Sequence, residues 1–128
     1  MVLKPEPAIS TAMVFSDPDL PRNTEKRSLA ELLNQPFAND CEKVVRTQYP
    51  KVEKALLWLL QYAPARLTGT GACVFAEFDD EKSAQAVFQQ KPKEFFGFVA
   101  KGLNVSPLHM MLKQLSTNQS IYTQPEVI

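Results

Sequence analysis

The chain has 128 residues, a common length for a single domain, and 45% of them are hydrophobic. These values argue against wholesale disorder and suffice for one hydrophobic core. The 14 basic and 14 acidic residues cancel. A net charge of zero argues against a nucleic-acid or anionic-membrane partner, because either would need an excess of basic side chains on one face.

The sequence shows neither a membrane span nor a secretory leader. No apolar run reaches the roughly 18 residues of a transmembrane helix, and the first residues lack a basic region followed by an apolar one. Cys41 and Cys73 are far apart, and without a second pair at metal-ligand spacing they indicate structural thiols in a reducing compartment. We therefore expect a cytoplasmic protein.

The first elements predicted are the end of a strand and a short helix. Residues 1–3 are apolar and meet a proline-rich segment. Ser10 or Thr11 can cap a helical turn over residues 11–15, because a hydroxyl accepts from the free N–H groups of a first turn. The prolines of residues 17–24 then predict a loop.

Two segments have the spacing of a helical capping box. Ser28 and Glu31 fit a helix over residues 29–34, which Pro36 would close. Asn39 and Glu42 have the same spacing and predict the start of another helix, which runs toward the next proline.

A core helix is predicted over residues 51–62. Pro50 is tolerated at the first helical position, and apolar residues recur on one face at helical spacing. Trp58 is better explained as a packing residue than as a platform for a ligand, because aromatic side chains dominate buried cores.

Residues 68–73 are rich in glycine and threonine and precede a strand. The strand is predicted because Val74, Ala76 and Phe78 alternate with the neighbouring residues and would face the core. The loop lacks the third glycine and following helix of a dinucleotide fingerprint, and the Gly-Lys ending of a Walker A loop. Two interpretations remain open: a tight hairpin in which glycine supplies positive φ, or a backbone nest for a phosphate.

Asp79 and Asp80 would cap the next predicted helix, which runs to about residue 90 and is followed by a strand over 95–101. The neighbouring acidic residues are better explained by capping than as a metal site, so no metal site is predicted. His109 stands alone, without an orienting partner for catalysis. From residue 113 the composition turns polar and predicts a disordered tail over 113–128.

The order of elements is strand, helices, strand, strand, helix, strand. This order predicts an α+β fold, a two-layer sandwich of split βαβ (ferredoxin-like) type, with an antiparallel sheet of about four strands and helices on one face.

The stretch Leu67–Phe75, LTGTGACVF, resembles the C-terminal glycine motif of the GHMP small-molecule kinases. Three further stretches agree in order: residues 10–15 with the Asp-Pro-Asp-Leu-Pro-Arg-Asn that follows, residues 39–42, and residues 98–109. The resemblance covers residues 2–112. It implies a kinase C-terminal domain over 1–112, followed by the tail.

The resemblance is closest to members that use ATP and Mg²⁺ to phosphorylate the 2-hydroxyl of a cytidine-diphosphate-linked methylerythritol in non-mevalonate isoprenoid (terpenoid) biosynthesis. It implies that Phe15 packs on the cytosine ring and that Thr11 lines the same pocket. It also implies that a glycine loop lies beside the transferred phosphate, formed by Thr68, Gly69, Thr70, Gly71, Ala72 and Cys73.

The family's N-terminal half, with its ATP loop, catalytic aspartate and catalytic lysine, has no counterpart in these residues. We therefore expect no catalytic residue in this chain, no kinase activity and no bound cofactor for the chain alone, and self-association through apolar surface that the other half would cover. The alternative is a non-catalytic ferredoxin-like binding or interaction module derived from the kinase fold.

Overall fold

The computed structural model describes residues 1–35 and 37–122. Four strands form one sheet in the order β2-β3-β1-β4, and every neighbouring pair is antiparallel. The strands are β1 (Val2–Lys4), β2 (Ala65–Leu67), β3 (Val74–Ala76) and β4 (Phe96–Phe98). This sheet confirms the predicted α+β fold.

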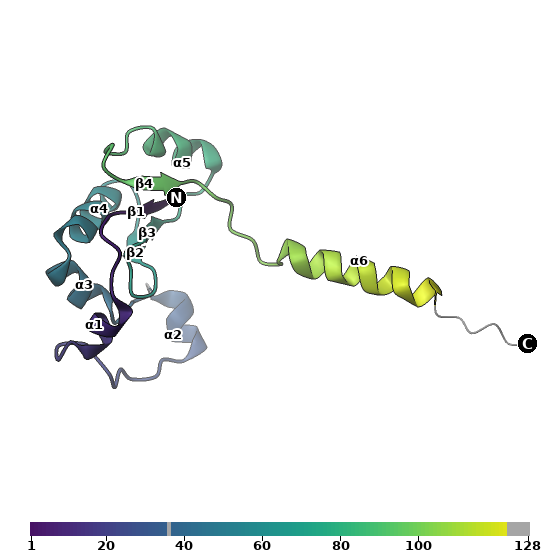
Figure 1. Ribbon diagram of the computed structural model, residues 1–128, viewed down its shortest axis with the longest axis horizontal. Coiled ribbons are helices and arrows are strands. Elements are labelled where there is room, and N and C mark those ends of the chain that lie inside the picture. The colour runs from purple at the N-terminus through teal and green to yellow at the C-terminus, as the bar shows by residue number, and fades with distance from the viewer. Residues whose placement is uncertain (36, 123–128) are drawn as a thin grey trace, which may run out of the picture.

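The helices are α1 (Thr11–Ser16), α2 (Leu29–Asn34), α3 (Glu42–Gln48), α4 (Pro50–Leu60), α5 (Glu81–Phe88) and α6 (Pro107–Tyr122). The first four lie between β1 and β2, and α5 lies between β3 and β4 (Figure 1). Each of these connections joins strands that are separated in the sheet by one other strand, which is the topology of a split βαβ fold.

The core lies between one face of the sheet and the helices. Leu3 and Val74 are fully buried on this face, and the buried side of α4 packs against it. Helix α5 lies on the same side, because a Cβ on Gly97 would meet both Leu3 and Phe88 within 3.4 Å. The predicted alternation along β3 is confirmed, and the indole of Trp58 packs against the core as predicted.

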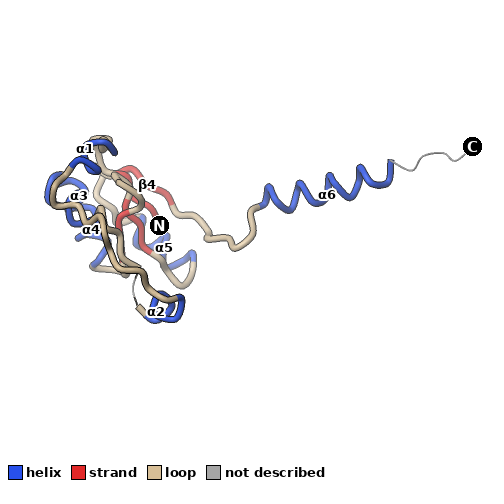
Figure 2. Tube along the Cα trace, turned by 90° about the horizontal axis from the view of Figure 1, so that it is seen from below, coloured by secondary structure: helices blue, strands red, loops and turns tan. Residues whose placement is uncertain are grey.

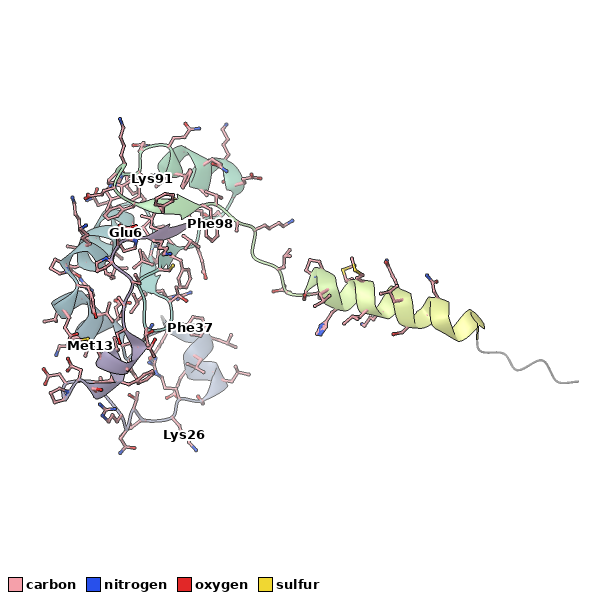
Figure 3. The ribbon with its side chains drawn as sticks, in the orientation of Figure 1. Glu6, Met13, Lys26, Phe37, Lys91 and Phe98 are labelled. Atoms are coloured by element: carbon pink, nitrogen blue, oxygen red, sulfur yellow. The ribbon has the colours of Figure 1, made fainter. Side chains whose placement is uncertain are left out.

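The opposite face of the sheet carries exposed aromatic side chains. Phe96 and Phe98 on β4 are 75% and 57% exposed, and Phe98 can be followed in Figure 3. The register places Val2 opposite both Phe98 and Phe75. An apolar row therefore crosses this face from β4 to β3.

The first two predicted helix starts are confirmed. The Ser10 hydroxyl accepts from the N–H of Met13 at the start of α1. Ser28 and Glu31 form the predicted capping box of α2, whereas the predicted helix stop at Pro36 lies outside the described residues.

The capping box predicted at Asn39 and Glu42 is wrong. The N-cap of α3 is Cys41, whose side chain makes no capping hydrogen bond. Asn39 and Glu42 instead bond to the backbone of the hairpin that joins β2 and β3.

The C-terminal part differs from the sequence-based expectation. Strand β4 is shorter than the predicted 95–101, and residues 113–122, predicted to begin a disordered tail, form the C-terminal part of α6. Pro107 suits a first helical position, and the following residues include good helix formers and neither glycine nor proline. Helix α6 extends away from the rest of the chain (Figures 1 and 2); the predicted tail beyond residue 122 lies outside the described residues.

Among the described helices, none combines the length and the apolar character that crossing a membrane requires.

Candidate functional site

The glycine loop is a tight hairpin between β2 and β3. Thr68 donates its N–H to the carbonyl of Cys73 at 3.0 Å, and Gly71 donates to the carbonyl of Thr68 at 3.0 Å. Gly69 and Gly71 have φ angles of +56° and +89°, a region that disfavours residues with a Cβ. The hairpin interpretation is therefore confirmed, whereas phosphate binding by the loop remains a prediction.

The two glycines differ in their surroundings. A Cβ on Gly71 would lie 2.7 Å from Cδ1 of Ile9 and 3.1 Å from Cδ1 of Leu67, whereas one on Gly69 would meet nothing within 4 Å. Gly71 therefore lets the loop approach the side chains beneath it, and Gly69 lies in the open part of the turn.

The first turn of α1 contacts this loop. The hydroxyl oxygens of Thr11 and Thr70 are 3.0 Å apart, and either can be the donor. The structure thus brings together the hydroxyl predicted to line a base pocket and one residue of the loop predicted to lie beside a phosphate.

Phe15 lies one turn further along α1 and is 52% exposed. Its carbonyl accepts from the Arg22 guanidinium at 2.6 Å, and the same nitrogen donates to the carbonyl of Asp17 at 3.0 Å. These bonds hold the C-terminal end of α1 while the aromatic ring stays accessible. Met13, on the same helix, is also exposed and can be located in Figure 3.

Asn39 and Glu42 support the hairpin at its base. Nδ2 of Asn39 donates to the carbonyls of Leu67 at 3.0 Å and Gly69 at 2.8 Å. Oε2 of Glu42 accepts from the N–H of Leu67 at 3.0 Å. The spacing of this pair in the sequence is that of a capping box, which predicts bonds within α3, whereas the folded chain brings both side chains to the hairpin.

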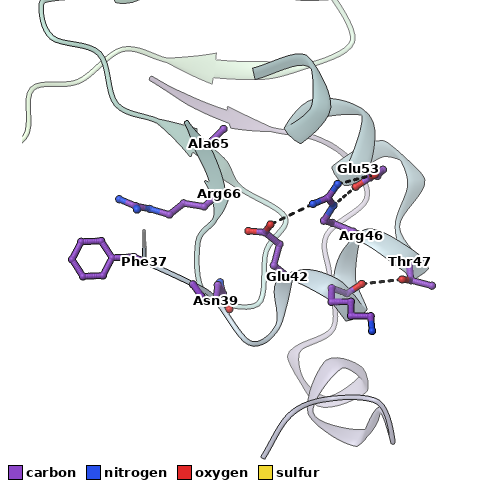
Figure 4. Close-up of a pocket in the computed structure, with 10 residues that line it drawn as sticks. Phe37, Asn39, Glu42, Arg46, Thr47, Glu53, Ala65 and Arg66 are labelled. Carbon is purple, nitrogen blue, oxygen red and sulfur yellow. Dashed lines mark hydrogen bonds and ion pairs between the residues drawn. The ribbon is translucent and has the colours of Figure 1, made fainter. Parts of the chain in front are cut away.

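An ionic network continues from Glu42 into the helices (Figure 4). Nη1 of Arg46 lies 3.6 Å from Oε1 of Glu42, and the Arg46 guanidinium forms a bidentate ion pair with Glu53 of α4. The bond from Arg46 is the main reason that the pKa of Glu53 is lowered, and the same bond raises the pKa of Arg46. These residues line a hollow of about 610 Å³. Because the Arg46 guanidinium already contacts the carboxylates of Glu42 and Glu53, we interpret it as a structural residue.

Arg66, on the face of β2 opposite the buried Leu67, lines the same hollow. Its guanidinium carbon lies 5.2 Å from the ring centre of Phe37 and 4.9 Å from that of Phe75. It also pairs with Glu77 at 2.9 Å. This stacking explains the half-buried position of an arginine on a strand.

The acidic residues at the start of α5 act as a cap. Oδ1 of Asp80 accepts from the N–H of Ser83 at 2.7 Å, and this bond is the main cause of the lowered pKa of Asp80. Within residues 1–35 and 37–122, no group of three or more His, Cys, Asp and Glu side chains is arranged to hold a metal ion.

In a comparison with protein families, residues 22–96 match the family "GHMP kinases C terminal". That range is more than half of the chain. The chain belongs to the GHMP kinase C-terminal family.

Relatives of this GHMP domain are named 4-diphosphocytidyl-2-C-methyl-D-erythritol kinase. The Haemophilus influenzae protein is 70% identical across 100% of this chain and 41% of its own length. The Pasteurella multocida protein is 70% identical over 91% of the chain and 39% of its own length, and that of Histophilus somni is 62% identical over 98% and 40%.

The GHMP domain thus spans about two-fifths of the length of these relatives. Their names identify the relatives as kinases, which supports the kinase-domain interpretation and not the alternative of a non-catalytic module.

Proposed function

We propose that this chain is the substrate-side, C-terminal domain of an ATP-dependent kinase that phosphorylates the 2-hydroxyl of 4-diphosphocytidyl-2-C-methyl-D-erythritol in a cytoplasmic isoprenoid pathway. The identity to relatives with this name supports the choice of substrate. The contact between Thr11 and Thr70 supports the proposed site, because it joins helix α1 to the glycine loop.

In this proposal, α1 and the glycine loop bind different parts of one ligand. The accessible ring of Phe15 stacks on the cytosine, since any flat base offers a π face to an aromatic side chain. The hydroxyl of Thr11, on the same helix as Phe15, contacts the loop through Thr70. Loop N–H groups other than those of Thr68 and Gly71, which bond within the hairpin, then face the phosphate side of the ligand.

The chain's own contribution is to position the substrate. Phosphoryl transfer depends mainly on alignment and charge stabilisation, so a backbone loop can contribute without ionisable side chains. ATP with Mg²⁺ supplies the phosphoryl group in such a reaction. Because the described residues offer no acidic cluster for the metal, we assign them no role in holding it.

Titration of the chain with 4-diphosphocytidyl-2-C-methyl-D-erythritol, followed by ¹H–¹⁵N NMR, tests this proposal. We expect resonance shifts confined to the surroundings of Thr11, Phe15 and Thr70. Phe15→Ala should weaken binding about fivefold or more, given that stacking on a base contributes about 1–3 kcal/mol. Met13→Ala is the matched control, because Met13 is also more than half exposed and lies on the same helix. Equal loss in both variants, or no shifts at all, would contradict the proposed site.

The chain alone is proposed to be inactive. Purified protein mixed with substrate, ATP and Mg²⁺ should produce no ADP above the rate of a blank without protein. Sustained ADP formation that follows the protein through gel filtration would refute this part of the proposal.

We also propose that the isolated chain self-associates. Phe96 and Phe98 form an exposed apolar surface on β4, an edge strand of the sheet. Exposed apolar patches and free strand edges both favour contact with another chain.

A further inference from the structure

At the end of β2, the backbone N–H and carbonyl of Leu67 lie at an edge of the sheet. The sheet order places β2 at the edge, and Leu67 lies opposite Val74. The next pair, Thr68 and Cys73, exchanges a hydrogen bond. Because bonded and non-bonded pairs alternate along an antiparallel ladder, the N–H and the carbonyl of Leu67 point away from β3.

Two side chains satisfy these groups in place of a neighbouring strand. Glu42 accepts from the N–H of Leu67 at 3.0 Å, and Asn39 donates to its carbonyl at 3.0 Å. The Leu67 side chain is only 2% exposed and is packed into the core. The residue that precedes the glycine loop is therefore fixed on three sides.

Asn39 also bonds to the glycine loop itself. The amide nitrogen that contacts Leu67 donates to the carbonyl of Gly69 at 2.8 Å, and Oδ1 of Asn39 accepts from the N–H of Cys41 at 2.9 Å. Gly69 directly precedes Thr70, whose hydroxyl contacts Thr11. A short chain of contacts thus leads from Asn39 to α1.

The support is itself held by the core helices. Glu42 is 23% exposed and pairs with Arg46, which contacts Glu53 on α4. Figure 4 shows these three side chains in a row beside the hairpin. The neighbouring Val44 and Val45 on α3 are buried, so the position of Glu42 follows that of the core.

We infer that Asn39 and Glu42 are positioning residues for the glycine loop and, through the contact between Thr70 and Thr11, for the base-binding helix α1. The part of this inference that concerns the ligand rests on the proposed function. The part that concerns the conformation of the loop stands on the hydrogen bonds alone.

The variant Asn39→Asp tests the inference in the whole chain. Asp keeps the oxygen that accepts from Cys41 but lacks the N–H donors, and its carboxylate would face two carbonyl oxygens. Hydrogen exchange by NMR should show the amides of Thr68 and Gly71 losing about tenfold in protection, as expected for loss of a net hydrogen bond.

Asn34→Asp is the matched control. Asn34 also donates its side-chain amide to a backbone carbonyl, that of Ala30 at 2.9 Å, but in α2. It should leave the loop unchanged. Equal exchange at the loop amides in the parent, Asn39→Asp and Asn34→Asp would overturn the inference.

Glu42 provides a second measurement that does not depend on Asn39→Asp being folded. Glu42→Gln keeps an oxygen that can accept from Leu67, whereas Glu42→Ala does not. We expect the Leu67 amide to lose about tenfold in protection in the Ala variant and much less in the Gln variant. If Glu42 holds the Leu67 amide directly, Glu42→Gln should keep most of the protection that Glu42→Ala loses. Equal loss of protection in both variants would refute this role.

Titration with cytidine 5′-diphosphate separates the two hypotheses. Weaker binding by Asn39→Asp than by Asn34→Asp supports positioning of the ligand pocket. Equal binding by both, with a loosened loop, would refute that role while the proposed function stands. If the parent chain does not respond to the nucleotide, the proposed function fails, and hydrogen exchange alone decides whether Asn39 and Glu42 fix the loop.

Discussion

The hydroxyl oxygens of Thr11 and Thr70 lie 3.0 Å apart, although 59 positions separate the two residues along the chain. This bond joins the first turn of α1 to the glycine loop. Thr11 is exposed and Thr70 is half-buried, so the bond competes with water and its net contribution to stability is expected to be small. Its importance lies in fixing the relative position of two parts of the candidate site.

A double-mutant cycle should detect this bond. Thr11→Val and Thr70→Val each remove one hydroxyl, and the double variant should be more stable than the sum of the single effects predicts, by about 0.5–1 kcal/mol. Urea unfolding of the four proteins measures this coupling. Thr117→Val combined with Thr70→Val is the control, because Thr117 lies on α6 and donates to the carbonyl of Lys113 within that helix. Coupling of the same size in the control pair would show that the cycle does not report the contact.

Replacing glycines by alanine should give a graded loss of stability. At Gly71 a Cβ combines a positive φ with a distance of 2.7 Å to Ile9, and we expect about 2–4 kcal/mol of destabilisation. At Gly69 only the positive φ acts, at a cost of about 1–2 kcal/mol. Gly102→Ala is the control, since a Cβ there meets nothing within 4 Å.

Urea midpoints of these three alanine variants check the order. A Gly71→Ala protein as stable as Gly102→Ala would contradict the close approach of the loop to Ile9. A Gly69→Ala protein as unstable as Gly71→Ala would mean that backbone conformation, and not packing, decides the loss.

Local patterns were sufficient to predict most of the fold. The buried alternation at Val74 and Ala76 depends only on strand geometry, and the capping box of Ser28 and Glu31 closes within one helical turn. The resemblance to a kinase family, and not any periodicity, pointed to Phe15 and Thr11 as site residues.

The support of the loop could not be predicted in this way. Asn39 bonds to carbonyls 28 and 30 positions away, and its spacing to Glu42 is the same as in a capping box. Which partner such a side chain selects is decided by where the sheet edge lies after folding. Similarly, the composition beyond residue 112 indicates polarity but does not exclude a solvent-exposed helix, which is what α6 forms.

Acid should destabilise the chain partly through Glu53. The hydrogen bond from Arg46 is the largest cause of the lowered pKa of Glu53 in the folded state. A carboxyl group with a depressed folded pKa contributes stability above its unfolded pKa, about 4.3, and this contribution is lost as the pH falls through the folded value. Unfolding should therefore require less urea as the pH falls below about 5.

The variant Glu53→Gln isolates this effect. It should lose up to about 1 kcal/mol near neutral pH, the range for a partly exposed ion pair, and its deficit against the parent should shrink in acid. Some acid sensitivity should persist, because N–H donors at helix starts lower the pKa of Glu31 and Asp80. Glu25→Gln, in the exposed loop before α2, controls for the change in net charge. A constant deficit of Glu53→Gln at every pH would contradict this account.

Self-association should depend on the exposed face of the sheet. β4 is an edge strand, and Phe98, Val2 and Phe75 form an apolar row across the face. Phe96→Thr combined with Phe98→Thr removes apolar surface but keeps residues that favour strands. Sedimentation equilibrium should show a mass that rises with concentration for the parent and stays near 14.4 kDa for this variant.

Helix α6 offers a competing contact surface and so supplies the control. Leu108, Met111, Leu112 and Leu115 are exposed and recur at the spacing of one helical face. Leu112→Gln combined with Leu115→Gln disrupts that stripe and should leave the association of the parent unchanged. If only the helix variant dissociates, the contact lies on α6 and the sheet face is not the interface; a parent chain that stays monomeric would refute self-association itself. Far-UV circular dichroism confirms that each variant is folded before its mass is compared.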